Sequence, residues 1–180
     1  METVIQLNSE AKLSEHFTLG ELTKTSHKGV YNIPSHEAIE NLKRLCPWLE
    51  YLRKRYNELP SSWETARPEG ALATEGTQDR IGVEEKALLP IIINSGYRSP
   101  QLNRKVGGAP TSNHLTGCAV DIRVSGQEQL IQYAAILIQY ANETHQDFDE
   151  LLLEKNKHGA IWLHFAVRPK GNRRKVNIMV

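Results

Sequence analysis

The sequence predicts an α+β fold in which a mainly antiparallel sheet packs against helices. Two observations favour this class. Over about residues 35–56, apolar residues recur at three- and four-residue steps, which is typical of a helix with one buried face. Near the C-terminus, short apolar runs at 148–154 and 160–167 indicate two strands joined by a turn. Helices come first and most strands later, so the chain lacks the regular alternation of a parallel α/β sheet.

Capping signals mark where the first helices begin. Thr18 is followed three residues later by Glu21, a capping box that opens a short helix through about residue 25. Ser35 caps the longest helix, and its apolar stripe consists of Ile39, Leu42, Leu45, Leu49, Leu52 and Tyr56. Pro47 lies inside this stripe, and we expect it to kink or split the helix near Cys46.

The second half of the chain predicts two more helices and five strands. Ser99 and Pro100 open one helix, which Gly107 and Gly108 end, and the other helix spans about 127–143. The expected strands are 88–94, 119–124, the hairpin of 148–154 and 160–167, and an edge strand at 175–180.

The segment from about 60 to 86 has little periodicity and is rich in Pro, Gly, Ser, Thr and Glu. We interpret it as an exposed insertion loop, either a tolerated surface insertion or a lid. The remainder fits one domain, so residues 1–180 are expected to form a single domain with this insertion.

Composition narrows the function classes. The 180 residues are 39% hydrophobic and 24% charged, with a formal net charge of +1, which is typical of a soluble globular protein and gives no argument for nucleic-acid binding. The short basic run at 173–175 is interpreted as a solvated cluster. No window predicts a membrane span and no signal peptide is recognisable, so we expect synthesis in the cytoplasm. Cys46 and Cys118 are expected to be reduced and buried.

Three polar residues occupy unusual positions for their chemistry. Asp121 lies between Val120 and Ile122, and His164 lies in the otherwise apolar segment 161–167. A buried carboxylate is costly unless it is paired or binds a metal. Together with His114, seven residues before Asp121, they provide two imidazoles and one carboxylate, a zinc set that leaves a fourth position open. Taken singly, a satisfied core histidine or a paired aspartate is the better interpretation of each residue, and the spacing of the three together leaves the two interpretations equal.

A wider pattern surrounds these residues. It comprises Ser95-Gly-Tyr-Arg98, Ser112-x-His114-x-x-Gly117-x-Ala-x-Asp121, Trp162-x-His164, and the N-terminal Leu13-Ser-x-His16-Phe-Thr. Over nearly the whole chain apart from the leader, the insertion and the last ten residues, the sequence resembles the zinc D-alanyl-D-alanine carboxypeptidase family. The similarity is to its small bacterial and phage branch, which is related in fold to the Hedgehog signalling domain.

The resemblance implies a role for each matching position. His114, Asp121 and His164 fall where the family has its Zn²⁺ ligands. Arg98 falls where the family places a positive charge near the substrate, although a structural ion pair is an alternative. Ser112 matches a substrate-contacting serine, and a loop-capping hydroxyl is an equal alternative.

The general base is the least certain position. Many relatives carry an acidic residue three positions before the last histidine ligand, where this chain has Ile161. The branch that it resembles has a glutamate at the end of the preceding strand, and Glu154 matches it. A hairpin turning near 156–159 pairs Glu154 with about 160–162, within reach of His164. Glu150 shares that side of the strand and is the reserve candidate, whereas Asp149 points the other way.

The sequence therefore predicts a zinc metallopeptidase of peptidoglycan stem peptides, either a D,D-carboxypeptidase or an endopeptidase, with a phage-type lysin as a compatible setting. Its site of action would be the bacterial cell wall, and we expect a monomer. A zinc-containing cell-wall binding or interaction module without turnover is the alternative, since Hedgehog relatives keep the metal while acting as binding proteins.

Overall fold

The computed structural model describes residues 8–59 and 88–178. Their elements are α1 (Leu19–Thr23), α2 (His36–Glu58), β1 (Ile93–Ser95), α4 (Pro100–Lys105), the 3₁₀ helix η1 (Asn113–Thr116), β2 (Ala119–Arg123), α5 (Gln127–Thr144), β3 (Glu150–Lys155), β4 (Ile161–Ala166) and β5 (Lys175–Ile178). Helices together with a mostly antiparallel sheet confirm the α+β class. The predicted insertion at 60–86 lies outside the described residues.

One five-stranded sheet organises the molecule, in the order β1-β2-β4-β3-β5. Its neighbours pair antiparallel except β3 and β5, which pair parallel. The predicted hairpin is confirmed as β3 and β4, and Glu154 pairs with Trp162 as expected. The predicted C-terminal strand is β5, at the edge of the sheet. Strands β2 and β4 are therefore neighbours in the interior of the sheet, and each of them is paired with a strand on both sides.

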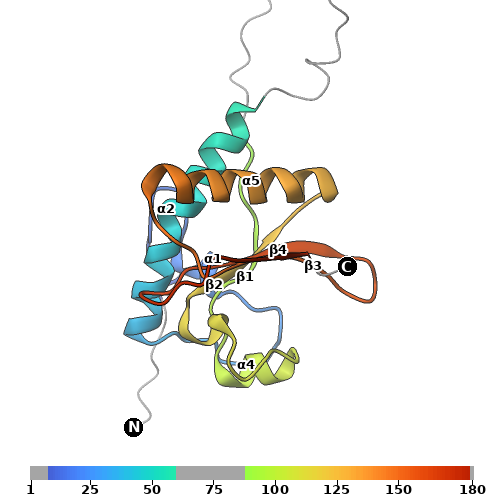
Figure 1. Ribbon diagram of the computed structural model, residues 1–180. Coiled ribbons are helices and arrows are strands. Elements are labelled where there is room, and N and C mark those ends of the chain that lie inside the picture. Colours follow the sequence, from blue (N-terminus) through green and yellow to red (C-terminus); the bar gives the residue numbers. More distant parts are fainter. Residues whose placement is uncertain (1–7, 60–87, 179–180) are drawn as a thin grey trace, which may run out of the picture.

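Helices α2 and α5 pack on one side of the sheet, and α4 lies on the other (Figure 1). The core between α2, α5 and the sheet is aromatic at its centre. Trp48 of α2 contacts Phe165 of β4 at 5.1 Å and Phe148 at 6.3 Å between ring centroids. Burial of the apolar stripe of α2 against this core holds the helix in place. Within the described residues, no helix is long and apolar enough to cross a bilayer.

Two sequence predictions about element boundaries are wrong. Helix α2 runs without interruption through Pro47, so it is not split near Cys46. Proline removes one backbone hydrogen bond, but Leu45 and Leu49 on either side are fully buried, and their packing keeps one continuous helix.

The strand expected at 88–94 is confined to β1, Ile93–Ser95. Leu88 and Leu89 are more than half exposed. Instead of joining the sheet, the N–H and carbonyl of Leu89 bond the side chain of Asn57 at the end of α2. Pro90, which cannot donate a ladder hydrogen bond, separates this contact from the strand.

The chain after β1 is pinned by polar contacts. Tyr97 donates its N–H to the carbonyl of Leu22 at the end of α1. The buried Asn32 side chain donates to the carbonyls of Thr23 and Tyr97 and accepts from the N–H of Ser99. These bonds satisfy backbone groups that would otherwise be buried without partners. They fix the segment that presents Gly96 and Arg98 to the centre of the sheet.

Candidate metal centre

The register of the two central strands brings Asp121 and His164 together. Asp121 of β2 and His164 of β4 are direct cross-strand partners. Residues opposite each other on adjacent strands project from the same face of the sheet. The side that they share is opposite the apolar core, because Val120, Ile122, Leu163 and Phe165 alternate with them and belong to that core.

His114 reaches the same point from η1. Ser112 caps this short helix, and Gly117 ends it in the left-handed conformation, with φ 72°. The chain then enters β2 two residues after Gly117, and Asp121 follows His114 by seven positions. All three side chains are buried, with exposed fractions of 2% for His114 and 7% for Asp121 and His164.

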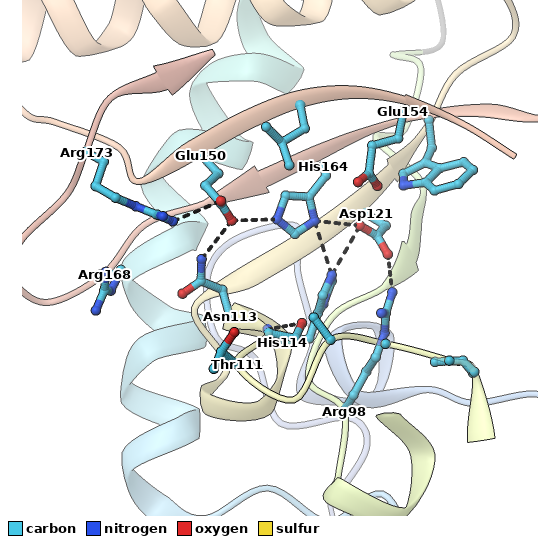
Figure 2. A pocket seen from close by; sticks show the side chains of 17 residues that line it. Arg98, Thr111, Asn113, His114, Asp121, Glu150, Glu154, His164, Arg168 and Arg173 are labelled. Atoms are coloured by element: carbon cyan, nitrogen blue, oxygen red, sulfur yellow. Dashed lines mark hydrogen bonds and ion pairs between the residues drawn. The ribbon is translucent and has the colours of Figure 1, made fainter. Parts of the chain in front are cut away.

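The ligand atoms of the three residues converge on one point (Figure 2). Nε2 of His114 lies 3.2 Å from Oδ1 of Asp121 and 3.3 Å from Nδ1 of His164, and the last two atoms are 2.9 Å apart. Ligands bound tetrahedrally at 2.0–2.1 Å are separated by about 3.3 Å. The cluster therefore has nearly the spacing of three corners of a zinc tetrahedron.

Hydrogen-bond accounting shows that, when both imidazoles are neutral, the three ligand atoms offer lone pairs to one point. Nδ1 of His114 lies 2.6 Å from the carbonyl oxygen of Gly96, which only accepts, so Nδ1 carries the proton and Nε2 is a bare acceptor. On His164, Nε2 faces a carboxylate oxygen of Glu150 at 3.7 Å, which leaves Nδ1 as the lone-pair nitrogen when the ring is neutral. Two imidazole lone pairs and a carboxylate oxygen then point at one another. Such a donor set fits a divalent metal ion.

Electrostatics support the same conclusion. Burial alone would raise the pKa of Asp121, but the contacts with His114 and His164 outweigh burial and lower it well below the usual range. For His164, burial lowers the pKa, yet the hydrogen bond to Asp121 and the nearby carboxylate of Glu150 prevail and raise the pKa to about 9. Positive charge is thus favoured at the point where the three side chains meet.

Arg98 holds the outer oxygen of Asp121. Its guanidinium donates to Oδ2 of Asp121 and, through Nε, to the hydroxyl of Ser95 at 2.8 Å. The second carboxylate oxygen is therefore occupied, which leaves Oδ1 to face the histidines. Arg98 also lines the adjoining cavity. The alternative role of Arg98, a structural ion pair, is therefore present. Its contact with a substrate stays a prediction.

Ser112 lies at the start of η1. Its hydroxyl accepts from the N–H of His114 at 3.3 Å, so it caps the helix that carries the first histidine. The same residue lines the cavity beside the cluster. The capping role is present, and contact with a substrate stays a prediction.

The two candidate bases on β3 have different surroundings. Glu150 receives hydrogen bonds or ion pairs from Asn113, Arg173 and Lys175, in addition to facing His164. Glu154 points toward the cluster from the other side, and Figure 2 draws no interaction to its carboxylate. Asp149 is fully buried and does not line the cavity, and its carboxylate is bound by Arg173 and Asn113.

Comparison with known proteins gives a family. The family model described as Peptidase M15 matches residues 57–158, more than half of the chain. The chain belongs to the peptidase M15 family. It is thus a metallopeptidase by family, and peptidases of this family are metal-dependent, in agreement with the donor set of the cluster. The match includes Arg98, His114, Asp121 and Glu154 and ends before His164. Among curated proteins, no sequence matches the chain.

In this M15 peptidase the cluster opens onto a cavity of about 610 Å³. Around the ligands its lining includes Arg98, Ser112, Glu150, Glu154, Trp162, Arg168 and Arg173. The indole Nε1 of Trp162 is buried there without a hydrogen-bond partner. Sequence reasoning included Trp162 as part of the Trp162-x-His164 motif without a role in the site, and it did not place Arg168 or Arg173 there. The basic run at 173–175 was interpreted as solvated, but Arg173 and Lys175 bind the acidic residues that begin β3.

Proposed function

We propose that this M15 peptidase is a zinc-dependent hydrolase of peptide bonds in peptidoglycan stem peptides. The observation that carries the proposal is a buried His114–Asp121–His164 cluster at the floor of a cavity whose wall also holds Glu154, for which the described residues provide no hydrogen-bond or ion-pair partner. The cavity is wide enough for a short peptide. Peptidoglycan as the substrate class and the bacterial cell wall as the site of action rest on the family resemblance.

The ligand set favours zinc over other cations. Two imidazole nitrogens and one carboxylate leave a fourth tetrahedral position open, as catalytic zinc sites do. Calcium and magnesium prefer oxygen ligands and higher coordination numbers. When bound, zinc would lower the pKa of a water to about 7 and polarise the carbonyl to be attacked.

Glu154 is proposed as the general base and acid. Its carboxylate lies on β3 opposite Trp162 and points toward the cluster. From there it would accept a proton from the attacking water and deliver it to the leaving amine. Glu150 suits this task less well, because its oxygens already accept from Asn113, Arg173 and Lys175.

Arg98 and Ser112 are proposed to hold the substrate. The guanidinium N–H groups of Arg98 that do not bind Asp121 or Ser95 would donate to a carbonyl or to the oxyanion that develops from it. The hydroxyl of Ser112 accepts from His114 and retains its own proton, which it would donate to the substrate backbone. Both D,D-carboxypeptidase and endopeptidase cleavage are compatible with these contacts.

Direct assay tests the proposal. Purified protein loaded with zinc is incubated with muropeptides, and the products are identified by mass spectrometry. We expect loss of a terminal D-alanine or of a cross-linked dimer, and a fall in kcat of at least about 100-fold for Glu154→Gln. His114→Ala is expected to lose bound zinc, measured by elemental analysis. Full zinc content in His114→Ala would overturn the ligand set.

A binding module without turnover is the second candidate. Ile161, which begins β4, occupies the position where many relatives carry an acid, and this observation favours it. The same assay separates the two, because muropeptide binding by zinc-loaded protein without any product supports the module and sinks the hydrolase.

A further inference from the structure

The cavity extends from the metal centre to a cationic end. Figure 2 shows Arg168 and Arg173 on one side of the cluster and Glu154 on the other. Arg168 follows β4 four residues after His164, which corresponds to about 13 Å of extended chain. A peptide of up to about four residues would span this distance. Thr111 also lines this part of the cavity.

Charge accounting distinguishes Arg168 from its neighbours. Asp149 binds Arg173 through two hydrogen bonds of 2.8 Å and receives a third from Asn113. Glu150 pairs with Arg173 and with Lys175. Among the acids of residues 8–59 and 88–178, Arg168 approaches Asp149 alone, at 3.7 Å between Nη1 and Oδ1, which is too far for a hydrogen bond. Two carboxylates thus face three cations, and Arg168 is the cation whose donors are not used by these acids.

A second groove of about 350 Å³ adjoins the first and shares Arg168 with it. The two also share the segment Thr111, Ser112 and Asn113. Lys170 adds another positive charge to the second groove, and Glu37 is the acidic residue in its lining. Arg168 therefore lies where the two hollows meet, and its surroundings carry an excess of positive charge.

We propose that Arg168 binds a free carboxylate of the peptide substrate, up to about four residues from the hydrolysed bond. The inference rests on the proposed function for the identity of the substrate. A guanidinium with unused N–H groups can bind a carboxylate in a bidentate manner. Thr111 lines the same cavity, and its hydroxyl is a further donor. The substrate class is thus an acidic peptide, whose carboxylate is either the C-terminus or a branch or side-chain group.

Matched peptides test the proposal. Stem peptides are prepared in pairs that differ in one group, the C-terminal carboxylate or an internal carboxylate, either free or converted to the carboxamide. For the native protein we expect amidation of one of these groups to raise KM by about 10-fold with little change in kcat. Arg168→Gln is expected to show the same rise with the free peptide and no further rise with its amide. Arg168→Lys should restore part of the discrimination.

Arg104→Gln is the matched control, because Arg104 lies exposed at the end of α4 and does not line either hollow. It should discriminate as the native protein does. Binding of the same peptide pairs to zinc-loaded Glu154→Gln, by isothermal titration calorimetry, keeps the test independent of turnover. Preference for a free carboxylate in binding supports the site even if no peptide is hydrolysed. Equal treatment of free and amidated peptides by the native protein, or unchanged discrimination in Arg168→Gln, would overturn it.

Discussion

Glu150 and Glu154 are two carboxylates on one face of β3, and their surroundings assign them different tasks. Glu150 is enclosed by Asn113, Arg173 and Lys175, and its Oε2 faces the far nitrogen of His164. A carboxylate behind a metal-bound histidine fixes the tautomer and orientation of the ring and makes it a stronger ligand. Glu150 thus acts through His164, whereas Glu154 faces the cavity directly.

We predict that Glu150→Gln lowers zinc affinity by about 10- to 100-fold while the fold is retained. The amide keeps the size of the side chain but removes the charge that faces Nε2 of His164. Competition with a chromophoric chelator measures the affinity, and circular dichroism checks the fold. Glu154→Gln is the control and should bind zinc as the native protein does, because Glu154 has no drawn interaction with a ligand. Equal affinities of the native protein and Glu150→Gln would contradict the role given to Glu150.

At this scale the sequence predicted the three residues that cluster better than the residues that support them. Asp121 and His164 interrupt apolar strands, and that signal is local. The contacts of Glu150 depend on Arg173 and Lys175, more than twenty residues away, and on which strand β5 joins. No local pattern encodes that pairing. The acidic group Asp147, Asp149 and Glu150 was the available hint that the basic run at 173–175 has partners.

Among the elements, the turn from η1 into β2 controls the geometry of the centre. Gly117 has φ 72°, and a Cβ built there would lie 2.4 Å from the carbonyl oxygen of Ala38 in α2. Only glycine tolerates both the left-handed backbone and this close approach. The turn therefore fixes the distance between His114 and Asp121. It also packs directly against α2, the longest helix.

Gly117→Ala is predicted to destabilise the protein by more than the roughly 1–2 kcal/mol that a left-handed alanine costs, because the clash with α2 adds to it. Gly107→Ala is the matched control: it has the same φ of 72° but no atom within 4 Å of the added Cβ. Urea unfolding of both variants measures the difference. Equal losses of unfolding free energy would show that the contact with α2 relaxes without cost.

The sequence predicted element boundaries correctly where a capping residue or a proline at the first helical position marks them. It failed where tertiary packing determines whether an element continues. Thr18 and Glu21 form the expected capping box, and Ser99 with Pro100 opens α4. By contrast, the effect of Pro47 on α2 depends on the buried neighbours of the helix. Local propensity contains no information about such tertiary packing.

On the scale of the whole molecule, the C-terminal segment adds an edge strand to the sheet that carries the candidate metal centre. Strand β5 pairs parallel with β3, a connection that the alternating pattern of 175–180 did not specify. The α+β class and the hairpin followed from local periodicity, whereas the strand order follows from long-range contacts. Arg173 and the fully buried Asp149 fasten this segment to the start of β3.

This fastening predicts how stability depends on pH. Burial alone would raise the pKa of Asp149, but hydrogen bonds from Arg173 and Asn113 outweigh it and lower the pKa below its ordinary value. A carboxylate with a depressed pKa stabilises the folded state above its unfolded pKa of about 3.9. That contribution is lost as the pH falls through the folded pKa.

We predict that Asp149→Asn is about 1–3 kcal/mol less stable than the native protein at pH 7, because Arg173 loses its charged partner. The difference should begin to shrink below about pH 4, where the unfolded carboxylate takes up its proton, and it should vanish once the pH has fallen through the lowered pKa of the folded carboxylate. Urea unfolding between pH 7 and pH 3 measures both curves. Asp147→Asn removes an exposed acid that pairs with Arg174 at 3.0 Å, and it should cost no more than about 0.5 kcal/mol. If the stability of Asp149→Asn runs parallel to that of the native protein across this range, the buried pair with Arg173 does not set the acid limit of the fold.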